Sequence, residues 1–348
     1  MSVIGSRPEI IQAAPLTAAL TAHVEEILVH TGQHYDDALS DAQILDTRLP
    51  RSRYNLGVGS RSDAEQLALG EERVGEVLDA ERPDGVLVRG DTNATLAAAR
   101  ATAARGLPLF HVEAGLRSHR ADMPEERNRV ETDRLAGVLF APTDSAKANL
   151  EAEAVDGEVH VTGDVLCDML ASWRDRLPAA ASGEEYLLAT VHRNYNTDDP
   201  ARLQAVLDCL GRSPWPVVLP LHPRTRARMA ESSLELPGNV RPSEPVPYTQ
   251  MLALERGARA IATDSGGVVR EAYLWGVPCV TLREETEWVE TVETGWNAAV
   301  GADPDRFAAA LRRRTPAERP PVFGDGNAAE RIAALTARRL TGIRGTVA

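Results

Sequence analysis

The 348-residue sequence has few aromatic residues, few cysteines and no long run of apolar residues. Phe, Trp and Tyr together make up only 4% of the chain, so its cores must be built from Ala, Val and Leu, which suits close packing of helices on sheets. No stretch is long and apolar enough to span a bilayer, and no signal peptide is present. We therefore expect a soluble protein of the cytoplasm with no membrane partner.

Cysteines are too few, and basic residues are too scattered, to build some common kinds of site. Cys167, Cys209 and Cys279 lack the spacing of a metal site or a disulfide framework, and we expect them to be small core residues in a reducing compartment. The net charge is −13, and residues 312–314, three consecutive arginines, fit the solvated end of a helix. Because an acidic chain repels nucleic acid, no such partner is expected.

Short apolar runs alternate with segments of helical periodicity, which predicts an α/β fold with parallel sheets. A stretch rich in Ala, Ser and Pro around residues 171–183 separates two such series. We therefore predict two Rossmann-like domains, residues 1–167 and 168–348, with the last helix (328–340) free to pack back on the first. The run at 2–4 is short for a first strand, so we expect the natural chain to begin a few residues upstream.

The unusual polar residues of both halves follow the ends of predicted strands, where open α/β sheets bind ligands. The most informative stretch, 261–278, runs from an apolar strand through Ser265-Gly266-Gly267 into a helix. Unpaired N–H groups and the helix dipole favour a phosphate there, and glycine lets an anion approach the backbone. Glu271, about one turn further on, could accept hydrogen bonds from a ribose. The alternative is a tight turn whose glycines serve packing alone.

An ordered set of motifs extends over essentially the whole chain. It comprises Gly5-Ser-Arg7-Pro-Glu9, Thr31-Gly-Gln-His34, Gly90-Asp91-Thr92, His111-Val-Glu113-Ala-Gly-Leu-Arg117, Pro124-Glu125-Glu-Arg-Asn128-Arg129, His192-Arg193, His222-Pro-Arg224-Thr225, Asp264-Ser-Gly-Gly267 and Thr286-Glu-Trp288. In these motifs the chain resembles the non-hydrolysing UDP-N-acetylglucosamine 2-epimerases. The resemblance implies two Rossmann-like domains that face each other across a GT-B-like cleft, a UDP-sugar substrate, a homodimer, and no metal or dinucleotide cofactor.

The resemblance also implies a reaction and the residues that perform it. UDP-N-acetylglucosamine and UDP-N-acetylmannosamine would be interconverted by elimination of UDP and its re-addition to a glycal intermediate. Asp91, Glu113 and Glu125 would form the acid/base set, which is completed by His192. Substrate binding is then expected from Arg7, Gln12, Arg129, His222, Arg224, Ser265, Gly266, Gly267, Glu271 and Arg283.

Two positions depart from the family pattern. Gln12 stands where the family has a lysine, so it can donate only a neutral hydrogen bond near the diphosphate. Tyr195 stands where a glutamate normally follows the His192-Arg193 pair. The Thr-Glu-Trp segment at 286–288 also resembles the branch that epimerises diacetamido uronic-acid sugars, so the identity of the sugar stays open.

Several of these residues also have plainer interpretations. Asp91 could simply cap a helix, Arg129 could form a structural ion pair with Glu125 four residues earlier, and His192 could be a core histidine. Of Glu125 and Glu126, the motif favours Glu125 for chemistry, and we expect the other on the surface. Alternative functions are a hydrolysing epimerase, a GT-B glycosyltransferase and a UDP-sugar binder without turnover.

Overall fold

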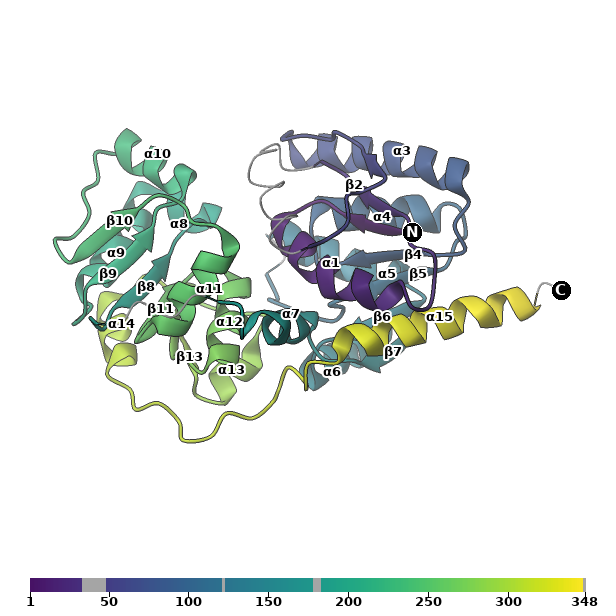
Figure 1. The fold of residues 1–348 in the computed structure, drawn as a ribbon. Coiled ribbons are helices and arrows are strands. Elements are labelled where there is room, and N and C mark those ends of the chain that lie inside the picture. Colours follow the sequence, from purple (N-terminus) through teal and green to yellow (C-terminus); the bar gives the residue numbers. More distant parts are fainter. Residues whose placement is uncertain (33–47, 121–122, 178–182, 347–348) are drawn as a thin grey trace. The chain divides into compact units, whose positions relative to one another are not determined.

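The computed structural model describes residues 1–32, 48–120, 123–177 and 183–346, so Gln33 and His34 lie outside the described residues. It contains two compact units (Figure 1). The N-terminal unit comprises Met1–Ser172 and Pro321–Ala348, and the C-terminal unit comprises Trp173–Pro320. Helix α7 (Val165–Trp173) is continuous through residue 167, so the division falls at the end of that helix. No helix among the described residues is long and apolar enough to cross a membrane.

The N-terminal unit is built on a parallel sheet with the strand order β3-β2-β1-β4-β5-β6-β7. Its strands are β1 (Ser2–Ile4), β2 (Leu28–His30), β3 (Tyr54–Asn55), β4 (Val86–Arg89), β5 (Leu109–Val112), β6 (Val138–Ala141) and β7 (Glu158–Val161). The sequence pattern predicts the central strands because each is a short apolar run buried on both faces. The order reverses between β1 and β4, as in a Rossmann fold.

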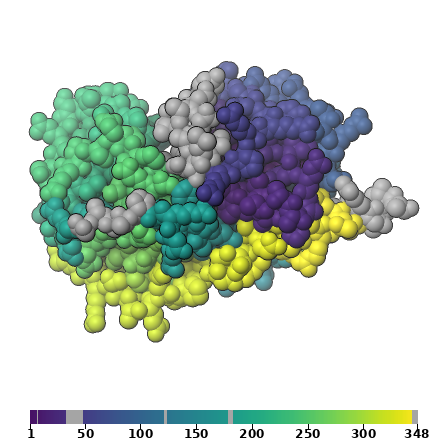
Figure 2. Space-filling view, in the orientation of Figure 1, coloured from purple at the N-terminus to yellow at the C-terminus, as the bar shows by residue number. Residues whose placement is uncertain are grey.

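Helices cover both faces of this sheet. Helix α15 (Ala328–Thr346) packs beside α1 (Arg7–Leu20), and both ribbon and space-filling views show them side by side, yellow against purple (Figures 1 and 2). Their apolar side chains meet the sheet at Phe110 and Phe140. The remaining described helices of the unit are α3 (Asp63–Glu81), α4 (Asn93–Ala103), α5 (Pro124–Leu135) and α6 (Asp144–Ala152).

The C-terminal unit repeats the same architecture with the strand order β10-β9-β8-β11-β12-β13, again parallel throughout. Its core lies between the sheet and the apolar faces of α9 and α14. The elements are β8 (Leu187–Thr190), α8 (Asn194–Thr197), α9 (Pro200–Gly211), β9 (Val217–Pro220), α10 (Pro223–Glu231), β10 (Val240–Ser243), α11 (Tyr248–Gly257), β11 (Ala260–Thr263), α12 (Gly266–Trp275), β12 (Cys279–Thr281), α13 (Val289–Glu293), β13 (Asn297–Ala299) and α14 (Pro304–Leu311).

Two α/β units with Rossmann-like sheets confirm the predicted fold class. The three cysteines are free and buried, as expected for core residues. In each sheet the strand order reverses at one point, between β1 and β4 and between β8 and β11. Ligands of open α/β sheets bind outside the carboxyl ends of the strands at this point. Arg7, Asp91, His192 and Ser265 follow these four strands, whereas Glu113, His222 and Arg283 follow the neighbouring strands β5, β9 and β12.

A buried ion network holds the turn that follows β5. Asp133, which is 0% exposed, accepts hydrogen bonds from His111 Nδ1 at 2.7 Å and from the backbone N–H of Gly115 at 3.1 Å. The oxygen that accepts from Gly115, Oδ2, also lies 2.7 Å from Arg117 Nη1. Burial alone would raise the pKa of Asp133, but His111 and Arg117 leave that pKa below its ordinary value. One carboxylate on α5 therefore fixes the turn that carries Glu113.

Replacing Asp133 by asparagine should lower the free energy of unfolding by about 1–3 kcal/mol, because the buried hydrogen bonds from His111, Gly115 and Arg117 are disturbed while Arg117 keeps its pair with Glu153. Since the folded-state pKa of Asp133 lies below its ordinary value, the aspartate stabilises the protein above that value and the benefit disappears as the pH falls through the folded pKa. The free energy of unfolding, measured by urea denaturation, should therefore differ less between the wild type and Asp133→Asn in acid than at neutral pH. Asp79→Asn, which breaks an exposed pair with Arg105, is the control and should change little; an equal effect of both variants would contradict the account.

Gly115→Ala should destabilise the same turn for a steric reason. Gly115 has a φ of +85°, and a Cβ there would overlap the carbonyl oxygen of Ala146. Gly106 has a φ of +61°, and a Cβ added there would have nothing within 4 Å, so Gly106→Ala should cost only about 1–2 kcal/mol of backbone strain. Urea denaturation should show a larger loss in the free energy of unfolding for Gly115→Ala than for Gly106→Ala. Equal losses in the two variants would show that the turn at Gly115 relaxes to accept the added methyl group.

Candidate functional site

Three candidate carboxylates lie in turns at the carboxyl edge of the N-terminal sheet. Asp91 follows β4, Glu113 follows β5, and Glu125 lies in the first turn of α5, which leads out of the same region. All three are half-buried. Because β4 and β5 are neighbours in register, the sheet itself brings the turns of Asp91 and Glu113 together.

Glu113 has an unusual backbone conformation. Its φ is 69°, in the left-handed region that residues with a side chain rarely adopt. Such strain persists only where surrounding interactions over-determine it, and it clusters at functional sites. Here the Asp133 network holds the adjacent Gly115 and Arg117. The left-handed conformation ends the strand at Glu113, so that its carboxylate lies in the turn that follows β5.

Gln12, the residue that stands in place of a lysine, contacts Glu113 directly. Its amide Nε2 donates to Glu113 Oε2, and the side chain is 5% exposed. The amide can orient the carboxylate but adds no charge to it. The departure from the family pattern thus changes the electrostatic environment of a candidate acid/base residue.

Asp91 pairs with Arg129 and does not cap a helix. The cap of α4 is Thr92, whose hydroxyl accepts from Thr95 N. Arg129 Nη2 donates to Asp91 Oδ2 at 2.5 Å, and its Nη1 donates to Glu126 Oε2 at 2.8 Å. The buried guanidinium therefore joins the turn after β4 to helix α5. The capping interpretation of Asp91 is wrong, because its neighbour supplies the cap.

Glu126 is buried, so the expectation that it lies on the surface is wrong. It is 6% exposed and accepts from the backbone N–H groups of Ser118 and His119, each at 2.9 Å. Burial alone would raise the pKa of Glu126, but these hydrogen bonds and Arg129 leave that pKa below its ordinary value. Glu126 thus has a structural role, and Glu125, the less buried of the two, is the candidate for chemistry.

Glu9 ties two strand-end turns of the N-terminal unit together. Its carboxylate accepts from the backbone N–H of Ser6 at 2.8 Å, from the Thr92 hydroxyl at 2.5 Å and from the Thr95 hydroxyl at 2.9 Å. Complete burial raises its pKa. The turn in which Arg7 begins α1 and the turn that carries Asp91 are therefore linked by one buried side chain.

In the C-terminal unit, buried Asp264 organises the ends of β8 and β11. It accepts from the backbone N–H groups of His192 at 3.0 Å and Arg193 at 2.9 Å, and from Asn196 Nδ2 at 3.2 Å. His192 Nδ1 also lies 3.3 Å from Asp264 Oδ1. The His192 side chain remains 37% exposed, so a simple core histidine is excluded.

Helix α12 begins at the turn predicted to bind phosphate. The first helical hydrogen bond runs from Val269 N to Ser265 O at 3.0 Å, so the N–H groups of the first turn have no partner within the helix. A Cβ on Gly266 would lie 2.6 Å from Glu287 Oε1, whereas one on Gly267 would meet only Ser265 Oγ at 3.7 Å. Packing therefore accounts for Gly266 and leaves Gly267 open to another reason, such as close approach of an anion.

The remaining candidates of this unit lie around the same strand ends. Glu271 is 5% exposed and accepts from the Tyr248 hydroxyl at 2.6 Å. The rings of His192 and His222 are 5.7 Å apart. Arg224 donates to exposed Asp198 at 2.6 Å.

Two buried residues, Arg283 and Tyr195, make contacts at the end of strand β12, and Tyr195 is the second departure from the family pattern. Arg283 is 1% exposed and lies 2.9 Å from Glu287 Oε2. The Tyr195 hydroxyl donates to Leu282 O at 2.9 Å, and burial raises the pKa of this tyrosine. Tyr195 therefore ties α8 to the end of β12 as a neutral group.

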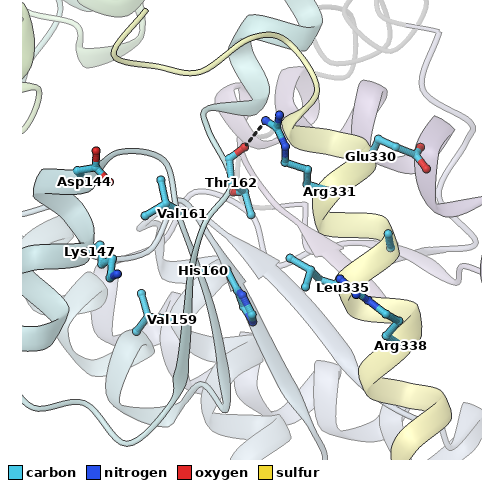
Figure 3. A pocket seen from close by; sticks show the side chains of 11 residues that line it. Asp144, Lys147, Val159, His160, Val161, Thr162, Glu330, Arg331, Leu335 and Arg338 are labelled. Carbon is cyan, nitrogen blue, oxygen red and sulfur yellow. Dashed lines mark hydrogen bonds between the residues drawn. The ribbon is translucent and has the colours of Figure 1, made fainter.

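A cavity of about 630 Å³ in the N-terminal unit has a lining of its own (Figure 3). It opens between α6, the edge strand β7 and α15. His160 Nε2 lies 3.0 Å from Glu158, Arg331 pairs with Asp325 at 2.6 Å, and Lys147 pairs with Glu151 at 3.5 Å. Each of these three basic side chains therefore has an acidic neighbour within 4 Å. None of the candidate site residues lines the cavity.

Sequence reasoning missed four residues that orient the candidates, namely Asp133, Glu126, Asp264 and Tyr248. Only Asp264 had a local signal, since it directly precedes Ser265 in the motif. Within the described residues, no three His, Cys, Asp or Glu side chains gather in a way that could hold a metal ion. What the N-terminal unit can supply is acid/base chemistry by carboxylates, and what the C-terminal unit can supply is binding of an anion.

Comparison with known proteins places the chain in a family. Residues 18–337 match the family model described as UDP-N-acetylglucosamine 2-epimerase. A UDP-N-acetylglucosamine 2-epimerase homolog of Methanococcus maripaludis is 39% identical, with 95% of this chain and 97% of the relative covered. A UDP-2,3-diacetamido-2,3-dideoxy-D-glucuronate 2-epimerase of Pseudomonas aeruginosa is 38% identical, with 97% and 99% covered.

A solved structure agrees with these relatives. The chain superposes on UDP-GlcNAc 2-epimerase of Methanocaldococcus jannaschii, solved in complex with UDP-GlcNAc and UDP, with a TM-score of 0.88 and 34% identity over 97% of this chain and 99% of that one. The ordered motifs, the paired Rossmann-like units and these matches lead to one conclusion. The chain belongs to the UDP-N-acetylglucosamine 2-epimerase family and is an isomerase of the epimerase type.

Proposed function

We propose that the protein interconverts UDP-N-acetylglucosamine and UDP-N-acetylmannosamine by elimination and re-addition of UDP. The observation that carries this proposal is the strained Glu113, which is presented at the carboxyl edge of the sheet beside the turn of Asp91. A left-handed glutamate held by a buried ion network is costly, and such a cost is expected where a carboxylate must meet a substrate.

The chemistry requires groups on both faces of the sugar. The C2 proton is not acidic enough for simple removal and return. In the elimination, a base takes this proton, a C1–C2 double bond forms, and the C1–O bond breaks with its electron pair leaving on UDP. In the return step an oxygen of UDP forms a bond to C1, the double bond is lost, and an acid delivers a proton to the opposite face of C2. Asp91, Glu113 and Glu125 provide the carboxylates for these transfers.

Departing UDP needs stabilisation of the charge that grows on its diphosphate. The resemblance assigns Arg7, Arg129 and His192 to this role, and the first turn of α12 at Gly266 and Gly267 supplies N–H groups. Glu271 accepts from the ribose. Asp264 fixes the backbone of His192 and directly precedes Ser265, so these two parts of the C-terminal unit are positioned by one side chain. We also propose a cytoplasmic homodimer, as the resemblance implies.

A specific observation favours a second substrate. The Pseudomonas aeruginosa relative named for a diacetamido uronate sugar is nearly as similar as the Methanococcus relative. The alternative function is therefore 2-epimerisation of such a modified UDP sugar.

Incubation with UDP-N-acetylglucosamine in deuterated water, followed by proton NMR at C2, tests the proposal. We expect the manno product to appear and both sugars to carry deuterium at C2. Exchange only with the diacetamido uronate sugar nucleotide would select the alternative. Release of free sugar and UDP would identify a hydrolysing enzyme. Binding without exchange on either sugar would overturn both epimerase functions in favour of a transferase or a binder.

The neighbouring glutamates of α5 allow a matched comparison of chemistry and structure. Glu125→Gln should slow C2 exchange by about 100-fold or more, the usual effect of losing an acid/base group, with little change in unfolding. Glu126→Gln should instead lower the free energy of unfolding by about 1–3 kcal/mol, because hydrogen bonds from Ser118, His119 and Arg129 are disturbed. Exchange kinetics and urea denaturation of both variants measure this. The reverse pattern would assign the catalytic role to Glu126.

A further inference from the structure

A buried hydrogen bond joins two helices of the C-terminal unit at the residue proposed to hold the ribose. The Tyr248 hydroxyl lies 2.6 Å from Glu271 Oε1. Tyr248 is 3% exposed and Glu271 is 5% exposed. An ionised carboxylate can only accept hydrogen bonds, so the phenol is the donor. A charge-assisted bond of this length is among the stronger kinds in proteins.

The two residues occupy defined places on their helices. Tyr248 is the first residue of α11, directly after Pro247, and Glu271 lies in the second turn of α12. The two helices pack against each other. Glu271 therefore follows the phosphate-binding turn at Ser265 by about one and a half turns, and Tyr248 reaches it from a separate element.

A carboxylate that binds a vicinal diol must be held in one orientation. The terminal torsion of a glutamate side chain is broad, so an unrestrained Glu271 would sample orientations that cannot accept from both ribose hydroxyls. A fixed donor on one oxygen limits this rotation before the ligand arrives, which reduces the cost of ordering on binding. The same hydrogen bond offsets part of the cost of burying the charge.

We propose that Tyr248 is a positioning residue that orients the Glu271 carboxylate toward the hydroxyl groups of the nucleotide ribose. The proposal rests on the proposed function, since it assumes that this unit binds the UDP part of the substrate. Tyr248 contributes to recognition of a ribonucleotide through Glu271 and takes no part in the proton transfers at C2.

A second tyrosine of the same unit provides a matched control. The Tyr186 hydroxyl donates to Leu254 O at 2.6 Å, so it also ties α11 to a neighbouring segment. It makes this bond to the backbone of α11 and not to Glu271. Tyr186→Phe thus removes a hydroxyl that anchors the same helix, without removing the proposed orienting contact.

The experiment measures binding of UDP, 2′-deoxy-UDP and 3′-deoxy-UDP by calorimetry to the wild type, Tyr248→Phe and Tyr186→Phe. The wild type should bind UDP more tightly than at least one deoxy analogue by about tenfold, the usual worth of a hydrogen bond to a charged group. In Tyr248→Phe the affinity for UDP should fall several-fold while that for the analogue hardly changes. The ratio of the affinity for UDP to the affinity for the deoxy analogue should therefore move toward one. Tyr186→Phe should keep the wild-type ratio.

The ratio separates positioning from a general loss of structure, because a merely loosened helix lowers all three affinities together. If Tyr248→Phe does not fold, Tyr248→Met removes the hydroxyl with a different apolar side chain and is measured in the same way. An unchanged ratio in the hydroxyl-free variant overturns the role of Tyr248 while leaving UDP binding intact. A wild type that does not bind UDP overturns the proposed function and this inference together.

Discussion

Buried carboxylates that accept backbone N–H groups hold the turns on which the whole site depends. Asp133 does this in the N-terminal unit through Gly115, and Asp264 does it in the C-terminal unit through His192 and Arg193. Both aspartates are fully buried. A charged acceptor forms stronger bonds to N–H groups than a neutral one, and an interior of low polarity strengthens them further. The same burial makes each aspartate intolerant of losing its partners.

This constraint explains why the candidate residues can be polar, strained and still well positioned. Parallel strands converge at one edge, and the reversal of strand order in each sheet leaves room there for a ligand. Glu113 keeps a left-handed backbone because Asp133 holds the residues after it, and Asp91 is held through Arg129 by Glu126. The carboxylates that we propose for the chemistry are thus supported by other carboxylates with a structural role.

The fold and the positions of the candidates could be predicted from the sequence because both depend on local pattern. Asp91 and Glu113 stand directly after apolar runs, and such runs mark strand ends without any knowledge of packing. The supporting residues could not be predicted in this way. Which of two adjacent glutamates turns inward was decided by Ser118, eight residues before Glu126, and Tyr248 meets Glu271 across 23 residues of chain. Contacts of that kind depend on how helices pack, which no short motif records.

The most direct test of this account is native-state amide hydrogen exchange at the N–H groups that the buried carboxylates accept. These are the N–H groups of Gly115, Ser118, His119, His192 and Arg193. The account predicts that they are protected as strongly as the strands they follow, opening only when the unit unfolds. Exchange at the rate of unstructured loops would show that the turns are not held by Asp133, Glu126 and Asp264, and would contradict the account.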